Sequence, residues 1–350
     1  METMNFCVAN YSLNKGNGID VTVAEFLKEL SRHHNVKAAV IKSDMDLPGI
    51  EITRYPANRP WKMPAVAREL DRQRFDFIST HYLPFDGVAT LMRTPHLLHD
   101  HGVPPLRSMM HNRGELALWA EVHAFRLFSA RRAAIALPIS DYIGNIFKNT
   151  YFYRGRMVKL PSGIEFPETE PETAGGEFGK YLLYVGRHTR YKGVDQLMEI
   201  FGEAKKELGD DVHLVTIGRA DQGYGEYLRA LAAKIGNVHM LGYVPDVWRY
   251  YAGCTAYATC TAWEGEDRPV IEAQYMGKPA VTYNNCSHPE VVYYGSLANS
   301  REEFREALIR HLSDARKDLS VRSRVVEKFW TRNTVRRYLE IVRDYCRASR

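Results

Sequence analysis

The chain has 350 residues, 45% of them hydrophobic and 25% charged, which is the composition of a folded globular protein of about two domains. It has no run of about 18 apolar residues and no signal-peptide pattern at its amino end, which argues against a membrane-spanning or secreted protein. The five cysteines are scattered and odd in number, which argues against a disulfide framework or a zinc ribbon. We therefore expect a cytoplasmic protein.

The positive charge of the chain is concentrated in its first half. Residues 1–165 carry 21 Lys and Arg against 16 Asp and Glu, and the rest of the chain is balanced. This surplus is compatible with peripheral contact at an anionic membrane surface, but it is too diffuse to indicate nucleic-acid binding.

The chain begins with a predicted strand, a glycine-bearing loop and a helix. The strand covers residues 5–9, Gly16 and Gly18 lie in the loop, and the helix is expected over 21–31. Such a unit lets backbone N–H groups approach a phosphate at the amino end of the helix. It lacks a full dinucleotide or P-loop fingerprint, so an ordinary turn is an equally good interpretation of these residues alone.

Two further strands are predicted over residues 36–41 and 75–79, with a helix over 62–74 between them. Four apolar residues share one face of this helix: Met63, Val66, Ala67 and Leu70. We interpret it as a helix that covers the sheet, and a helix lying on a membrane surface is the alternative.

Histidines gather near the ends of the next strands. His81 and His96 are followed by His99-Asp100-His101. The carboxyl ends of strands are where an open α/β sheet binds ligands. Side chains alternate along a strand, so His99 and His101 can converge while Asp100 points away. A metal site is one interpretation, and a polar contact from His101 to a sugar is the one we prefer.

The remaining elements continue the alternation of strands and helices. A linker rich in Pro, Glu and Gly is expected over 165–180, and five strands of a second βαβ series are expected near residues 181, 212, 237, 254 and 279. The other expected elements are a helix over 112–131, a strand over 133–138, a helix capped by Ser140 and running to about 148, and terminal helices over 301–313, 316–329 and 333–348.

The segment 184–193 ends a strand and opens a helix, which places Arg187 and Lys192 in a βα loop. Arg offers a planar fork to phosphate oxygens and Lys a mobile point charge, so the pair suits a diphosphate. One Arg and one Lys in a loop are also common on an ordinary solvated surface.

The segment 263–281 carries two carboxylates on a loop and a helix. Glu264 lies in the loop, and Glu272 is expected in the first turn of a helix that starts near Arg268. The backbone N–H groups around Asp267 to Val270 form the positive end of that helix, which favours a phosphate. Carboxylates beside such an anion site suit a nucleotide sugar, because they accept from hydroxyl groups. An acidic loop that only caps a helix is the simpler alternative.

These motifs resemble those of the retaining GT-B glycosyltransferases called glycosyl transferases group 1. Where the family usually has an aromatic residue, a glycine and an apolar residue, this chain has Glu266-Asp267-Arg268. The matching pieces are Val185-Gly186-Arg187, Lys192-Gly193, Val215-Thr216-Ile217-Gly218, Met240-Leu241-Gly242-Tyr243-Val244, Glu264-Gly265, Pro269, Glu272-Ala273, Gly277-Lys278-Pro279 and His288-Pro289-Glu290-Val291-Val292.

The resemblance implies an α/β protein with two doubly wound, Rossmann-like domains facing across a cleft. Residues 1–164 would form the acceptor-side domain, with the terminal helix 333–350 packing back onto it, and residues 165–332 would bind the donor. The implied donor contacts are Arg187 and Lys192 at the diphosphate, Glu272 at the ribose, Glu264 and His101 at the transferred sugar, Gly16 and Gly18 across the cleft, and Gly218, Tyr243 and Val244 at the base.

The implied reaction is transfer of a hexose from a nucleotide-diphosphate sugar to a hydroxyl of a sugar, lipid or small-molecule acceptor, with retention and without a metal or cofactor. The cations and helix amides would stabilise the charge that grows on the departing diphosphate. Three alternatives stay open: a sugar-nucleotide epimerase or hydrolase, a metal-dependent hydrolase built on His81, His99 and His101, and a non-catalytic protein that has kept the fold.

Overall fold

The computed structural model describes residues 3–106, 113–314 and 316–348. The chain divides into two compact units, which are described separately. The first comprises Met1–Glu165 with Phe329–Arg350, and the second comprises Phe166–Lys328. In the described part of the chain, no helix is both long and apolar enough to cross a bilayer.

The first unit is built on a parallel sheet of order β3-β2-β1-β4-β5-β6-β7. Its strands are β1 (Asn5–Leu13), β2 (Asn35–Ser43), β3 (Glu51–Arg54), β4 (Phe77–Thr80), β5 (His96–Asp100), β6 (Ile135–Pro138) and β7 (Arg156–Met157). Its helices are α1 (Gly18–Ser31), η1 (Pro60–Lys62), α2 (Met63–Arg72), α3 (Phe85–Ala89), α5 (Arg113–Arg132), α6 (Asp141–Tyr151) and α15 (Thr331–Ala348).

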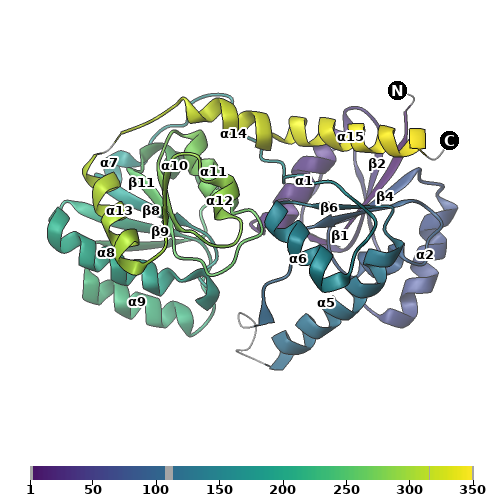
Figure 1. Cartoon of the computed structure of the whole chain (residues 1–350), viewed down its shortest axis with the longest axis horizontal. Coiled ribbons are helices and arrows are strands. Elements are labelled where there is room, and N and C mark those ends of the chain that lie inside the picture. Colours follow the sequence, from purple (N-terminus) through teal and green to yellow (C-terminus); the bar gives the residue numbers. More distant parts are fainter. Residues whose placement is uncertain (1–2, 107–112, 315, 349–350) are drawn as a thin grey trace. The chain divides into compact units, whose positions relative to one another are not determined.

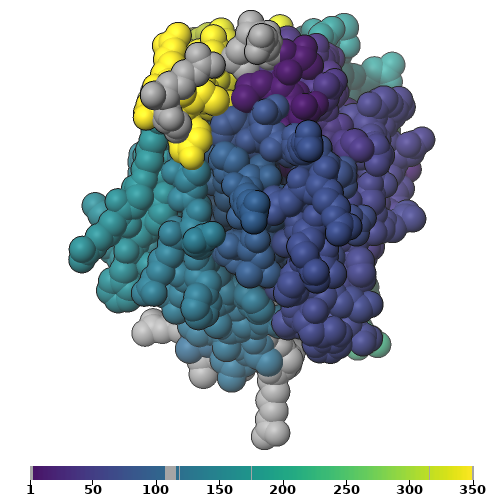
Figure 2. Space-filling view, turned by 90° about the vertical axis from the view of Figure 1, so that its right-hand side faces the viewer, coloured from purple at the N-terminus to yellow at the C-terminus, as the bar shows by residue number. Residues whose placement is uncertain are grey.

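Helices cover both faces of this sheet because its strands alternate apolar side chains between two cores. Phe6 and Val8 of β1 pack with α1 and α15 on one face, whereas Cys7 and Ala9 pack with α2 and α3 on the other. Figures 1 and 2 show α15, in yellow, beside the purple amino-terminal elements, although hundreds of residues separate them in the chain. The carboxyl-terminal helix therefore completes the core of the first unit.

The second unit is built on a parallel sheet of order β10-β9-β8-β11-β12-β13. Its strands are β8 (Lys180–Val185), β9 (Val212–Ile217), β10 (Val238–Gly242), β11 (Ala256–Thr259), β12 (Ala280–Tyr283) and β13 (Gly295–Ala298). Its helices are α7 (Gly175–Phe178), η2 (Arg190–Lys192), α8 (Val194–Leu208), α9 (Tyr224–Ile235), α10 (Trp248–Gly253), α11 (Arg268–Tyr275), α12 (His288–Val291), α13 (Arg301–Ser313) and α14 (Val321–Phe329). In Figure 1, α8 and α9 lie below the sheet and α10 to α12 lie above it.

Both sheets are parallel with helices on each face, which confirms the predicted α/β, Rossmann-like class for each half of the chain. The helix predicted over 62–74 buries its four apolar side chains under the sheet, so it covers the sheet and is not a membrane-surface helix. Residue 112 of one predicted helix and residues 349–350 of another lie outside the described residues.

Three local predictions are corrected. The short edge strand β3 was not predicted. The helix predicted over 316–329 begins only at Val321. The segment predicted as a linker packs onto the second unit, because Phe166 is buried and stacks on Tyr275 with 4.3 Å between ring centroids.

Candidate functional site

In each sheet the order in which successive strands are added reverses at one point, called the switch point. Predicted site residues lie in the loops that follow the strands beside it. In the second unit the chain runs β8, β9, β10 one way and then β11, β12, β13 the other, so β8 and β11 are neighbours. Ligands bind outside the carboxyl ends of strands at such a switch point. The loop after β8 carries Arg187 and Lys192, and the loop after β11 carries Glu264.

Lys192 and Glu264 form an ion pair across that switch point. Lys192 Nζ donates to Glu264 Oε1, and each side chain is about 15% exposed (15% and 14%). Gly193 follows the lysine with φ 62°, and a Cβ there would lie 2.5 Å from the carbonyl oxygen of Cys260. Only glycine therefore lets the two loops approach so closely. Arg187 is exposed, and its Nη2 donates to Tyr191 Oη at 2.8 Å.

The ion pair opposes the effect of burial on the pKa of each partner. Burial opposes the charge of Lys192, but the Glu264 carboxylate raises the pKa of the amine above its ordinary value. Burial, and then the carboxylate of Asp267, raise the pKa of Glu264, while Lys192 opposes that rise. The buried Tyr257 has a raised pKa, first from burial and then from surrounding acids that include Asp267, Glu264 and Glu272. Three carboxylates therefore converge on one small region of the second unit.

Glu272 lies in the second turn of α11, one residue later than the predicted first turn. Its Oε2 accepts from Tyr251 Oη at 2.8 Å, and its Oε1 lies 3.5 Å from Arg268 Nε. These contacts hold the carboxylate at a fixed orientation beside the amino end of the helix. Val270, in the first turn of α11, is fully buried and anchors that turn to the core.

Asp267 is the residue before α11 and has a left-handed backbone, with φ 56°. Its side chain turns inward, and its Oδ2 lies 2.9 Å from His288 Nε2. Neither side chain is more than 2% exposed. The carboxylate of Asp267 is therefore paired with His288. The backbone N–H of Asp267, which the sequence predicted to bind phosphate, lies at the amino end of α11.

The residues predicted at the base follow β9 and β10, the strands next to β8. Gly218 has φ 145°, and a Cβ there would lie 1.9 Å from the carbonyl oxygen of Gly186. Tyr243 is 46% exposed, and the guanidinium of Arg219 lies over its ring at 5.1 Å. Val244 is half-buried beside it. An exposed aromatic ring capped by a guanidinium is a surface on which a planar base can stack.

The first unit has its own switch point between β1 and β4. Gly16, with φ 79°, and Gly18, the first residue of α1, lie in the loop after β1. Asp20 organises this loop, since it accepts from Ser12 Oγ at 2.8 Å and from the backbone N–H of Asn14 at 2.9 Å. Sequence reasoning missed Asp20, although an acid in the first turn of a helix after a glycine loop was a usable signal.

The strand-end histidines gather on one side of the sheet. His81 Nδ1 lies 3.0 Å from His101 Nε2, and the rings of His81 and His99 stack with 4.1 Å between centroids. Burial lowers the pKa of His101 to about 4 and holds that of His81 and His99 well below the ordinary value. These imidazoles are therefore neutral at physiological pH.

The described geometry does not support the metal interpretation of these histidines. Among residues 3–106, 113–314 and 316–348, no group of three or more His, Cys, Asp or Glu side chains is placed to hold a metal ion. The ring nitrogens of His81 and His101 face each other in a hydrogen bond instead of converging on a common point.

Asp100 points to the opposite face, as strand alternation predicted, and joins a buried cluster. Arg126 of α5 is fully buried, its Nη1 donates to Asp100 Oδ1, and its Nε lies 3.2 Å from Asp86 Oδ2. Asp100 Oδ1 also accepts from the backbone N–H of Gly102 at 2.9 Å. This cluster fixes the turn that follows His101. The sequence offered no signal for Arg126, because a lone Arg within a helix normally faces solvent.

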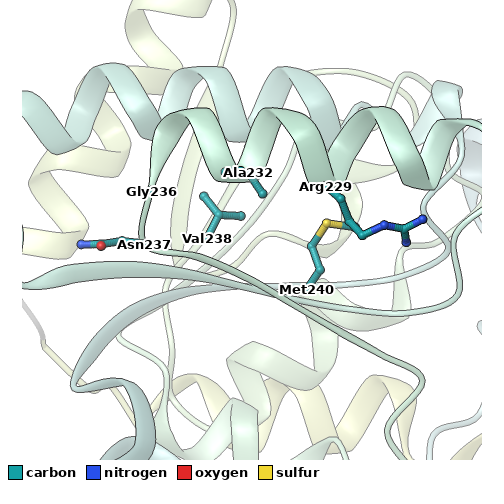
Figure 3. Close-up of a pocket in the computed structure, with 7 residues that line it drawn as sticks. Arg229, Ala232, Gly236, Asn237, Val238 and Met240 are labelled. Carbon is teal, nitrogen blue, oxygen red and sulfur yellow. The ribbon is translucent and has the colours of Figure 1, made fainter.

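A pocket of about 420 Å³ lies elsewhere in the second unit, between α9 and the edge strand β10 (Figure 3). Its lining includes none of the predicted site residues, so it is separate from the switch-point site. The lining residues are Arg229, Ala232, Ala233, Gly236, Asn237, Val238 and Met240.

Comparison with protein families matches each half of the chain. Residues 167–327 match the family described as glycosyl transferases group 1, and residues 16–166 match glycosyltransferase family 4. An uncharacterized glycosyltransferase of Haemophilus influenzae is 32% identical over 111 residues, which are 31% of this chain and 30% of that protein. The chain thus matches about a third of the length of that curated relative.

Solved structures share the fold over nearly the whole chain. Anabaena HepE, solved in complex with UDP and glucose, is 15% identical, with a TM-score of 0.77 over 97% of this chain and 100% of its own. Sucrose-phosphate synthase from Thermosynechococcus elongatus is 14% identical, with a TM-score of 0.80 over 99% of this chain and 100% of its own. WaaG, a glycosyltransferase of lipopolysaccharide biosynthesis, is 19% identical, with a TM-score of 0.68 over 94% of this chain and 95% of its own.

Proposed function

Because the chain belongs to the group 1 glycosyl transferases, which have the GT-B fold, we propose that it transfers a sugar from a nucleotide-diphosphate sugar to an acceptor hydroxyl with retention. The bond between the anomeric carbon and the diphosphate oxygen breaks, and a bond from that carbon to the acceptor oxygen forms. The acceptor proton leaves with the departing diphosphate or solvent. The first unit takes the acceptor and the second unit takes the donor.

The observation that carries this proposal is the Lys192–Glu264 ion pair at the switch point beside the amino end of α11. The lysine and Arg187 bind the diphosphate, whose negative charge grows as the sugar leaves. The carboxylate of Glu264 accepts from hydroxyls of the transferred sugar, and that of Glu272 accepts from ribose hydroxyls. Cations and helix amides supply the stabilisation of charge, so the proposed reaction needs no metal.

The donor base stacks on the exposed face of Tyr243, opposite Arg219 and beside Gly218 and Val244. The HepE complexes with UDP and with UDP-glucose support a UDP-hexose as the donor to be tried first. His101, Gly16 and Gly18 of the first unit contact the donor sugar and its diphosphate. His101 is neutral, so it acts by hydrogen bonding and not as a cation.

The acceptor is a sugar, a lipid or a small molecule, and the proposed setting is the cytoplasm. Trp61 is 70% exposed, and the guanidinium of Arg59 lies over its ring at 5.5 Å. An exposed indole beside cations, on a unit with excess positive charge, supports peripheral contact with an anionic membrane surface.

A thermal-shift screen of nucleoside diphosphates and their hexose conjugates tests the proposal. A ligand present at about 100 times its dissociation constant adds about 2.7 kcal/mol to the unfolding free energy. We expect UDP and one UDP-hexose to stabilise the chain, and Arg187→Ala, which removes an exposed cation, to reduce that gain. The absence of stabilisation by every nucleoside diphosphate would contradict the proposal.

Donor consumption with and without acceptors separates transfer from the alternatives. A transferase releases nucleoside diphosphate faster when its acceptor is present, whereas an epimerase or hydrolase converts the donor at the same rate without one. Binding without turnover across sugar, lipid and small-molecule acceptors would instead favour a non-catalytic protein.

A further inference from the structure

The loop that carries Glu264 ends in an unusual backbone. Asp267 has φ 56°, a conformation that residues with a Cβ rarely adopt, although Asp and Asn tolerate it better than most. The group 1 pattern usually has glycine at this position, which adopts such a φ without strain. This chain therefore places a carboxylate at a position with a positive φ.

The carboxylate of Asp267 pairs with His288, and that imidazole contacts acceptors through both ring nitrogens. His288 Nε2 lies 2.9 Å from Asp267 Oδ2, and His288 Nδ1 lies 3.0 Å from the carbonyl oxygen of Tyr283 and 2.8 Å from Asn285 Oδ1. An imidazole that faces acceptors with both nitrogens is satisfied as the doubly protonated cation. The arrangement is thus a buried ion pair, not a neutral contact.

Two more contacts join the same two segments. Ser287 Oγ donates to the carbonyl oxygen of Glu264 at 3.2 Å, and Asn285 Nδ2 donates to that of Thr261 at 3.2 Å. We call residues 261–267 the acidic loop and residues 284–288 the clasp. The clasp therefore contacts the acidic loop at Thr261, Glu264 and Asp267. Of these three contacts, the one between Asp267 and His288 is an ion pair.

The charges around His288 all favour its cation. Burial opposes protonation, but the hydrogen bond and charge of Asp267, together with Cys286, raise the pKa of His288 to about 10. The Glu264 carboxylate also interacts favourably with the imidazolium. Lys192 is neutralised by its own bond to Glu264. An uncharged His288 would leave Asp267 as an unpaired buried carboxylate, which is costly.

We propose that Asp267 and His288 are positioning residues, whose ion pair clamps the acidic loop so that Glu264 is presented to the donor sugar. The proposal rests on the proposed function, because it assigns Glu264 to the donor. Neither Asp267 nor His288 needs to touch the substrate. The pair acts through the backbone of the loop on the orientation of Glu264 and on the amino end of α11.

Hydrogen exchange of the protein without ligand tests the clamp directly. Asp267→Asn keeps the shape of the side chain and its tolerance of a positive φ, but it removes the charge. We expect amides of the acidic loop to exchange at least tenfold faster in this variant. Asp210→Asn is the matched control, because it removes an Asp–Lys ion pair on the surface of the same unit. Unchanged exchange in Asp267→Asn would overturn the inference.

The pH profile of transfer separates positioning from a general loss of stability. In Asp267→Asn the pKa of His288 falls, so kcat is expected to drop about tenfold between pH 6 and 8, while the wild type stays level there. His288→Gln keeps a neutral hydrogen-bond donor and is expected to lose activity equally at every pH. Equal, pH-independent losses in both variants, in proportion to lost stability, would overturn the inference.

Failure of the proposed function would look different. A wild-type chain that binds no nucleoside diphosphate would contradict the assignment as a transferase. Accelerated exchange in Asp267→Asn, with kcat and the donor KM unchanged at every pH, would leave the transferase assignment intact and overturn the positioning role alone.

Discussion

Lys192 and Glu264 show how much of the proposed chemistry depends on single buried charges. In the wild type each neutralises the other at a site that is largely closed to water. A diphosphate that arrives there competes with Glu264 for the lysine, and the freed carboxylate can then accept from the sugar. Donor binding would thus replace the Lys192–Glu264 ion pair of the ligand-free protein with contacts from each side chain to the donor.

Lys192→Ala is expected to lower kcat on the order of 100-fold, the usual cost of removing one group that stabilises developing charge. The substitution also strands Glu264, so the unfolding free energy should fall, by less than the ~3–5 kcal/mol of a fully buried pair. The measurements are steady-state kinetics and urea unfolding.

The double variant Lys192→Ala/Glu264→Gln is the control, because it removes both charges. We expect it to regain stability without regaining activity. Recovery of activity in the double variant, or near-wild-type kcat in the single one, would contradict the role assigned to Lys192.

At the scale of elements, the first turn of α1 offers a test of close approach. A Cβ added to Gly18 has no other atom within 4 Å, and its φ is not in the left-handed region. Gly18→Ala should therefore leave the unfolding free energy unchanged or raise it by about 0.4–1 kcal/mol. If donor backbone contacts require glycine there, the donor KM should rise at least tenfold.

Gly176→Ala in α7 is the matched control, since a Cβ there also has no neighbour within 4 Å. It should affect the unfolding free energy in the same way as Gly18→Ala and leave the donor KM unchanged. Wild-type KM in Gly18→Ala would mean that the loop after β1 does not approach the donor.

His101 follows β5, whereas His96 is its first residue and not at its carboxyl end as predicted; both are buried and neutral, which makes the first unit sensitive to acid. Burial lowers the pKa of His101 to about 4 and that of His96 to about 3, whereas in the unfolded chain both titrate near pH 6.5. The unfolded state therefore binds more protons below pH 6.5, and stability is present above that pH and lost as the pH falls. The loss approaches about 1.4 kcal/mol per pH unit for each histidine.

Urea unfolding at several pH values between 7 and 4.5 measures this slope. His101→Gln, which removes one titrating group, should lower the slope of unfolding free energy against pH by the contribution of one histidine. His288 does not interfere, because its raised pKa makes its contribution complete below pH 6.5 and lost only as the pH rises toward 10. A level stability profile between pH 6.5 and 5 would contradict the neutral state of the cluster.

At the scale of the whole molecule, α15 returns the chain to the first unit and closes its core. Four of its hydrophobic side chains belong to that core, and Tyr338 Oη lies 2.6 Å from Ser79 Oγ of β4. Tyr338 also packs on His99, so the helix supports the histidine cluster from behind. The other three hydrophobic side chains of this set are Val335, Ile341 and Val342.

Deletion of residues 329–350 is expected to abolish cooperative unfolding of the first unit. Burying four such side chains contributes about 1.5–3 kcal/mol each, a sum comparable with the ~5–15 kcal/mol stability of a domain. The second unit should still unfold cooperatively, as followed by circular dichroism and by exchange of its amides. Arg343→Ala, at an exposed position of α15, should change neither transition.

The features of the fold and the site that could be predicted from the sequence are those that depend on local sequence patterns. Alternating strands and helices indicated the α/β class, because apolar periodicity and turn residues act over a few positions. The same periodicity placed Arg187, Lys192 and Glu264 in loops after strands. The edge strand β3 was not predicted, because its four residues are little buried and form no apolar run.

The sequence by itself determined the fold class, the loops that carry charge and the resemblance to a glycosyltransferase family. Only the tertiary structure decided which charges meet: Lys192 with Glu264, Asp267 with His288, and Arg126 with two aspartates. The physical reason is distance along the chain. These partners lie 21 to 72 residues apart in the sequence. Their pairing therefore depends on strand order and on burial, which raises the cost of an unpaired charge, and neither is encoded in a local window.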